Sequence, residues 1–127
     1  MSEADVLHEA RNTLSEEVVD GHRAIRSLME ELEAVDWYAQ RVEATNDQDL
    51  KEVLAHNRDE EKEHAAMVLE WLRRRDPVFD RHLRNYLFTE GSILAIEEAL
   101  DEEEEPNAGG GGSARGLGIG SLRSEIK

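Results

Sequence analysis

Residues 47–77 read DQDLKEVLAHNRDEEKEHAAMVLEWLRRRDP, and this segment has the pattern of one long amphipathic helix. From Leu50 to Leu72, apolar side chains recur three and four residues apart, the spacing of one face of an α-helix. The helix begins near Asp47, and Asp76-Pro77 ends it, because proline cannot continue the helical hydrogen-bond ladder. The stretch therefore predicts a long helix with one apolar face.

The segment before it predicts a second helix of similar length. A Thr13-x-x-Glu16 capping box, or Ser15 as an alternative N-cap, starts this helix near residue 15. Its apolar face continues to about residue 44, where Thr45-Asn46-Asp47 breaks it. A turn this short between two long helices permits only an antiparallel hairpin.

Shorter helical segments follow the hairpin. Pro77 suits the first position of a helix over residues 78–87, and Gly91 or Ser92 separates it from residues 93–100. Because no alternating strand pattern occurs, we predict an all-α fold, an antiparallel two-helix hairpin plus a short C-terminal helix.

The composition limits the partners that this chain can bind. Its 127 residues carry 30 acidic against 15 basic side chains, a net charge of −15, and no Cys. Nucleic acids are poor partners for such a chain, and a metal site would have to use oxygen and imidazole ligands. No stretch approaches the roughly 20 apolar residues of a membrane span, and the N-terminus is not a secretory signal, so we expect a cytoplasmic protein.

Composition also predicts the domain organisation. Residues 101–105 are all acidic, and Pro106 and a run of four Gly follow them, which is typical of a flexible linker. The predicted segments are an N-terminal extension (1–14), a helical domain (15–100), an acidic and Gly-rich linker (101–116) and a C-terminal peptide (117–127).

Three polar residues occupy positions where the helical pattern calls for Leu. Glu31 lies on the apolar face of the first helix, and Glu61-x-x-His64 places a carboxylate and an imidazole one turn apart on the second. A buried, unpaired carboxylate is costly, and neither face offers Arg or Lys at that level. An iron or manganese ion would compensate both carboxylates.

These three residues amount to half of a known type of site. Di-iron carboxylate bundles take a Glu from each of two helices and a Glu-x-x-His from each of the other two. One hairpin supplies one of each, and it is too small to bury its own apolar faces. We therefore expect two subunits to form a ferritin-like four-helix bundle with a di-iron site at their interface.

Four segments of the chain resemble the encapsulated ferritins, the ferritin-like cargo proteins of encapsulin nanocompartments. They are residues 30–38 (EELEAVDWY), 56–65 (HNRDEEKEHA), 70–74 (EWLRR) and 86–90 (YLFTE). The resemblance implies that Glu31, Glu61 and His64 are the ligands of a ferroxidase centre. It also implies a ring-shaped homodecamer of paired subunits, whose Fe(III) product mineralises inside the surrounding shell.

The same resemblance assigns roles to other residues. Glu30 and Glu33 correspond to an acidic site through which metal reaches the centre, and Trp37 to an aromatic residue beside it. Tyr38 is placed where its hydroxyl can donate a hydrogen bond to a metal ligand during catalysis. Calcium or zinc are alternatives to iron, at the centre or at the outer acidic site.

The C-terminal peptide resembles the signal that binds cargo to the inner wall of an encapsulin shell. Leu117, Ile119 and Leu122 are apolar anchors in a Gly-rich setting, as expected of a short peptide that binds in a groove. The resemblance therefore implies localisation in the lumen of a nanocompartment, with the shell protein as partner.

The predicted function is a ferroxidase that oxidises Fe(II) to Fe(III) for iron storage inside an encapsulin shell. Two alternatives stay open from the sequence. One is a metal buffer that binds Fe²⁺, Zn²⁺ or Ca²⁺ without turnover, and the other is a helical cargo protein that carries no metal.

Overall fold

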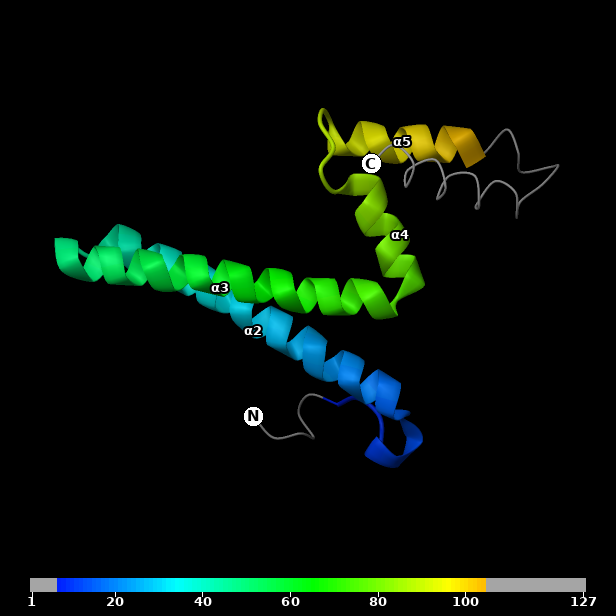
Figure 1. Ribbon diagram of the computed structural model, residues 1–127, viewed down its shortest axis with the longest axis horizontal. Coiled ribbons are helices and arrows are strands. Elements are labelled where there is room, and N and C mark those ends of the chain that lie inside the picture. The colour runs from blue at the N-terminus through cyan, green and yellow to red at the C-terminus, as the bar shows by residue number, and fades with distance from the viewer. Residues whose placement is uncertain (1–6, 105–127) are drawn as a thin grey trace. The chain divides into compact units, whose positions relative to one another are not determined.

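A computed structural model of the chain describes residues 7–104, and all of its regular elements are helical (Figure 1). The elements are the 3₁₀-helix η1 (Arg11–Thr13), α2 (Glu16–Ala44), α3 (Gln48–Arg75), α4 (Pro77–Tyr86) and α5 (Ile93–Glu104). No strand occurs within the described range, and the all-α prediction is confirmed. The chain divides into two compact units between Leu72 and Arg73, which are described separately below.

The first long helix, α2, begins where the N-cap alternative predicts. The Ser15 hydroxyl accepts a hydrogen bond from the Val18 amide at 3.1 Å, and acidic residues occupy the first turn. The Thr13 capping box is wrong, because Thr13 belongs to η1 and Ser15 is the residue at the N-cap of α2. The Thr13 hydroxyl donates to the Ala10 carbonyl, 2.6 Å away in the turn of η1.

The turn between α2 and α3 is held by side chains at both of its ends. The Asp47 carboxylate accepts from the Leu50 amide at 2.9 Å, which caps the start of α3. The Lys51 ammonium donates to the Val42 carbonyl at 2.7 Å and so satisfies one of the last carbonyls of α2. These bonds join the two long helices into the predicted hairpin, and Figure 1 shows them meeting at this turn.

The second unit contains the end of α3 with α4 and α5. Asp76 caps α4 by accepting from the Val78 and Phe79 amides, and Pro77 occupies the first turn as predicted. The Asp80 carboxylate, which is 28% exposed, accepts from the Arg73 and Arg84 guanidinium groups. Burial raises the pKa of Asp80, but these two hydrogen-bonded cations outweigh it, and the pKa is lowered overall.

The C-terminal helix expected after the hairpin is present as two short helices. The connection between α4 and α5 contains two residues with positive φ, Phe88 at 63° and Gly91 at 84°. The second helix, α5, ends at Glu104, so residues 101–104 are helical and the linker does not begin at 101. The acidic run continues the helix because Asp and Glu do not break it as Gly and Pro do.

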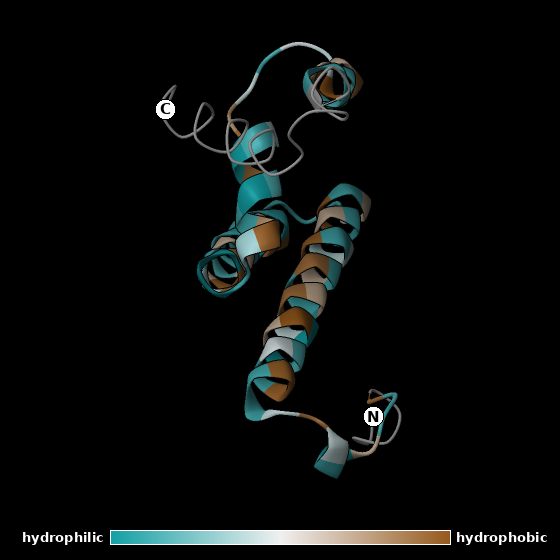
Figure 2. Ribbon diagram, turned by 90° about the vertical axis from the view of Figure 1, so that its right-hand side faces the viewer, coloured by the Kyte–Doolittle hydropathy of each residue, from teal (hydrophilic) through white to brown (hydrophobic). Residues whose placement is uncertain are grey.

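The hairpin leaves much of its apolar surface exposed. Buried apolar side chains in its described part are few, namely Val19, Ala65 and Leu72. By contrast, Ile25, Met29 and Leu32 of α2 are each about half exposed, at 49–53%. Figure 2 shows hydrophobic positions spread along the length of α2. An apolar face of this length is typical of a surface that another molecule covers.

Residues 1–6 and 105–127 lie outside the described range. Most of the predicted linker, and the predicted docking residues Leu117, Ile119 and Leu122, fall there. Among the described helices, none is both long enough and apolar enough to cross a membrane.

Candidate metal centre

The structure brings Glu31, Glu61 and His64 together between the two long helices. Each offers a ligand atom, and these atoms all lie within 4.8 Å of one another. His64 Nδ1 is 3.3 Å from Glu61 Oε1 on the same helix and 3.9 Å from Glu31 Oε2 across the hairpin. The spacing of three residues on α3 aligns Glu61 with His64, and the short turn places Glu31 opposite them. We call these three residues the trio.

One oxygen of the trio is both buried and unsatisfied. Glu31 Oε2 is inaccessible to solvent, and no hydrogen-bond donor reaches it in the described structure. The side chains of Glu31 and Glu61 are 21% and 28% exposed, whereas that of His64 is 48% exposed. A buried carboxylate oxygen without a donor is unfavourable, and a cation held between the three ligand atoms would satisfy it.

The donor set fits iron. Carboxylate oxygens and an imidazole nitrogen suit first-row divalent ions of the iron and manganese type, and the absence of Cys from the sequence excludes thiolate sites. With one ligand atom from each member, the trio would fill three of the roughly six positions of an octahedral ion and leave half of them open. The His64 side chain is 48% exposed, so a second molecule can approach the trio from this side.

The acidic residues predicted to form an outer site lie on α2 beside the trio but outside it. Glu30 and Glu33 are both exposed, and a Glu30 carboxylate oxygen lies 4.0 Å from the Arg26 guanidinium. An exposed ion pair of this length is worth little energy. Passage of metal through Glu30 and Glu33 stays a prediction.

The predicted aromatic residues form a cluster that includes a residue the sequence reasoning missed. The Arg41 guanidinium lies over both rings, 6.0 Å from the Trp37 centroid and 5.5 Å from the Tyr38 centroid. Spacings of three and four residues on one helix explain this contact and could have revealed it. Tyr38 lies two helical turns, about 10 Å, from Glu31 along α2. Its role as a hydrogen-bond donor at the centre stays a prediction.

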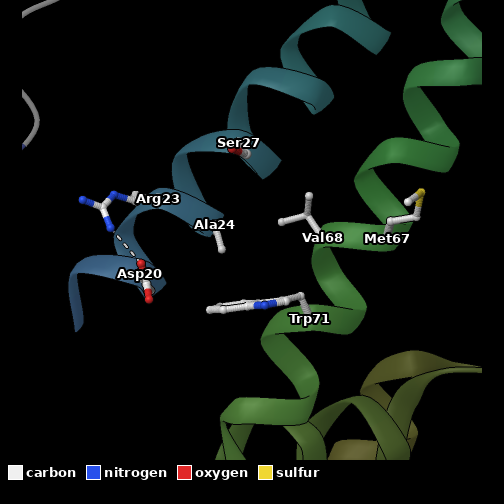
Figure 3. Close-up of a pocket in the computed structure, with 7 residues that line it drawn as sticks. All are labelled: Asp20, Arg23, Ala24, Ser27, Met67, Val68 and Trp71. Carbon is white, nitrogen blue, oxygen red and sulfur yellow. Dashed lines mark hydrogen bonds and ion pairs between the residues drawn. The ribbon is translucent and has the colours of Figure 1, made fainter. Parts of the chain in front are cut away.

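A second feature that the sequence did not reveal is a hollow of about 390 Å³ between α2 and α3 (Figure 3). The residues that line it include Ala24 on α2 and Met67, Val68 and Trp71 on α3. Asp20 and Arg23, paired at 2.8 Å, lie at its α2 side. We call this hollow the open-end groove. Figure 3 shows the Trp71 indole reaching across it from α3 toward α2.

The sequence profile of the EncFtn-like family matches residues 6–90, which include the whole trio. The chain belongs to this family. An "Encapsulated ferritin-like protein" of Rhodospirillum rubrum is 60% identical to this EncFtn-like chain over 123 residues, which are 93% of the chain and 88% of the relative. A "Ferritin-like protein" of Thermotoga maritima is 52% identical over 107 residues, 84% of this chain and 93% of the relative.

Two further comparisons agree with this membership. The "Encapsulin nanocompartment cargo protein EncC" of Myxococcus xanthus is 36% identical over 108 residues, 80% of this chain and 83% of the relative. A crystal structure of a protein from Nitrosomonas europaea is 63% identical and superposes with a TM-score of 0.67, over 68% of this chain and 96% of that one. The resemblance to encapsulated ferritins is therefore confirmed, and so is the ferritin-like helical fold.

Proposed function

We propose that this EncFtn-like chain is a ferroxidase, which oxidises Fe²⁺ to Fe³⁺ at a centre made by the trios of two copies. The observation that supports the proposal most strongly is the buried Glu31 Oε2, which has no donor and lies 3.9 Å from His64 Nδ1. A cation held by the trio would satisfy this oxygen and neutralise Glu31 and Glu61 together. The family assignment makes iron the expected cation.

Two copies are needed because one trio is half of a di-iron site. Across a two-fold axis, two trios supply four carboxylates and two imidazoles around two ions. The face of α2 that carries Glu31 contributes to the driving force for this pairing, since its Val35 and Tyr38 side chains are only partly buried in a single copy. Iron in such a site is substrate, and it leaves after oxidation.

The residues of the trio suit a change of iron charge. Carboxylate oxygens stabilise the ferric product more than the ferrous substrate, which favours loss of an electron to dioxygen as acceptor. Glu31 and Glu61 can shift between one-ion and bridging contacts as the charge rises, whereas His64 holds one end of each ion. Glu30 and Glu33, which are exposed on α2 beside the trio, are the proposed entry route for iron.

The fate of the product follows from the family rather than from the trio. In this proposal the Fe³⁺ mineralises outside the subunit, inside a surrounding encapsulin shell, since one relative is named as an encapsulin nanocompartment cargo protein. In this proposal, paired subunits assemble into a ring-shaped decamer. Leu117, Ile119 and Leu122 attach the ring to the shell wall, and deletion of residues 117–127 tests that attachment by co-purification with the shell protein.

The activity is tested by anaerobic loading of the full chain with Fe²⁺, followed by exposure to air. We expect ferric absorbance and oxygen uptake that depend on each member of the trio. Glu31→Ala, Glu61→Ala and His64→Ala should each remove most of the rate, and Glu43→Ala, an exposed acid elsewhere on α2, should not.

The two alternative functions give different results in the same experiment. Iron that binds to the trio without ferric absorbance or oxygen uptake would identify a metal buffer. A chain that binds no iron, and whose trio variants behave like the wild type, would identify a metal-free helical cargo protein. Either result would overturn the ferroxidase proposal.

A further inference from the structure

Ser27 is a polar side chain on the face of α2 that carries Glu31. It precedes Glu31 by four residues, about one helical turn, so the two side chains are neighbours on that face. Ser27 is half-buried, and it lines the open-end groove together with Ala24 (Figure 3). Among the α2 residues that line this groove, Ser27 is the nearest to Glu31 along the chain.

The hydroxyl of Ser27 is a hydrogen-bond donor that its own helix does not use. A Ser inside a helix often donates to the carbonyl four residues earlier. Within residues 7–104, the Ser27 hydroxyl makes neither this bond nor a bond to another side chain. Rotation about one side-chain bond can therefore turn it toward another acceptor without breaking an existing contact.

Glu31 is the acceptor that α2 places beside this hydroxyl. A carboxylate that binds an ion through one oxygen keeps a second oxygen, which is usually hydrogen-bonded in metal sites. Four residues of α2 lie one turn from Glu31, and only Ser27 carries a side-chain donor, since the others are Leu28, Ala34 and Val35. Long side chains in a helix also lean toward its N-terminus, which inclines Glu31 toward Ser27.

The described part of α3 supplies no such donor to Glu31. Glu31 Oε2 is buried and has no hydrogen-bond donor within residues 7–104. His64 Nδ1 lies 3.9 Å from it, which is too long for a hydrogen bond, and the imidazole is itself a candidate ligand of the ion. Ser27 is therefore the donor that remains for the Glu31 carboxylate once the trio holds an ion.

We propose that Ser27 is a positioning residue of the metal centre, whose hydroxyl donates a hydrogen bond to the Glu31 carboxylate when metal is bound. The inference rests on the proposed function, in which Glu31 is a ligand. With one oxygen on the ion and the other on Ser27, Glu31 is fixed in the one-ion contact rather than the bridging one. Ser27 itself does not touch the ion.

Mn²⁺ binding to the full chain, followed by the EPR signal of free Mn²⁺, tests this contact without iron oxidation. Ser27→Ala removes the hydroxyl and little else, and it should weaken Mn²⁺ binding about tenfold, as expected when a metal ligand loses its outer hydrogen bond. Ser27→Thr keeps the hydroxyl and is the matched control, so its affinity should stay within about threefold of the wild type. If Ser27→Thr binds as weakly as Ser27→Ala, the proposal is wrong.

Thermal unfolding in chelator separates a positioning role from a packing role. The Ser27 hydroxyl has no hydrogen-bond partner within the described residues, and Ala is the better helix former. Ser27→Ala should therefore not lower the Tm in chelator. A lower Tm would show that the hydroxyl stabilises the hairpin itself, and would overturn the positioning role.

A double-mutant cycle identifies the acceptor. Glu31→Ala removes the carboxylate, so adding Ser27→Ala in that background should change the Mn²⁺ affinity by less than about twofold. An equal loss in both backgrounds, or wild-type affinity for Ser27→Ala alone, overturns the contact and leaves the proposed function intact. Mn²⁺ binding that does not depend on Glu31 at all overturns both.

Discussion

Replacing Glu31 by Gln should stabilise the metal-free chain and weaken its metal binding. Gln keeps the shape of the side chain but removes one of two carboxylates whose oxygens lie within 4.8 Å of each other. At that distance two unit charges repel by about 3 kcal/mol at an effective dielectric constant near 20. Because these side chains are 21% and 28% exposed, solvent screening reduces this repulsion to about 1–2 kcal/mol.

That gain corresponds to a Tm increase of about 5–10 °C for a domain of this size. In the presence of metal, the wild type should instead have the higher Tm of the two proteins. The wild type gains stability as metal binds the folded state, whereas Glu31→Gln lacks one anionic ligand in each copy and should bind at least about 100-fold more weakly. The Glu31→Gln substitution should therefore raise the Tm of the metal-free chain and lower its affinity for metal.

The assay is thermal unfolding of the full chain followed by circular dichroism, with chelator and then with a series of Mn²⁺ concentrations. Glu43→Gln provides the matched control, since it makes the same change at an exposed position of α2. A lower Tm for Glu31→Gln in chelator would refute the electrostatic reasoning. An equal Mn²⁺-induced increase in both proteins would refute the assignment of Glu31 as a ligand.

Three further predictions concern the scaffold, and each is checked by chemical denaturation. Ser15→Ala should lower the free energy of unfolding by about 1 kcal/mol, because it removes the N-cap of α2. Thr13→Ala removes only the hydrogen bond to the Ala10 carbonyl in η1 and should cost less than half of that. Lys51→Met should cost about 1–2 kcal/mol, because the Val42 carbonyl loses a charged donor, and a neutral result would contradict that role. Because the pKa of Asp80 is lowered in the folded state, the Asp80 carboxylate stabilises the fold fully above its unfolded pKa near 3.9. This stabilisation is lost as the pH falls through the pKa of the folded state. Asp80→Asn should therefore cost about 1 kcal/mol at pH 7, and this cost should shrink as the pH falls below the unfolded pKa; a cost that does not change with pH would contradict it.

The sequence predicted the helices because their limits depend on local chemistry. Pro77 fixed the start of α4, and Asp47 and the apolar spacing fixed α3, all of which act within a few residues. The start of α2 was predicted with two candidate caps, Thr13 and Ser15, and the local pattern alone did not decide between them. The end of α5 was missed because an acidic run without Gly or Pro does not stop a helix.

The trio was predictable for a different reason. Each of its members breaks an apolar pattern, and Glu61 and His64 share a helix face by spacing alone. Its distances across the hairpin depend on how α2 packs against α3, which no local pattern fixes. The groove and the position of Arg41 over two rings depend on the same packing and on side-chain conformation, so they became visible only in three dimensions.

The most direct test of the central claim is a crystal structure of the full chain loaded with Fe²⁺, with anomalous diffraction measured at the iron edge. We expect two iron peaks about 4 Å apart, one on either side of a two-fold axis between two chains, contacted by Glu31, Glu61 and His64 of each chain. Iron bound elsewhere, or a single chain whose trio faces solvent without iron, would contradict it.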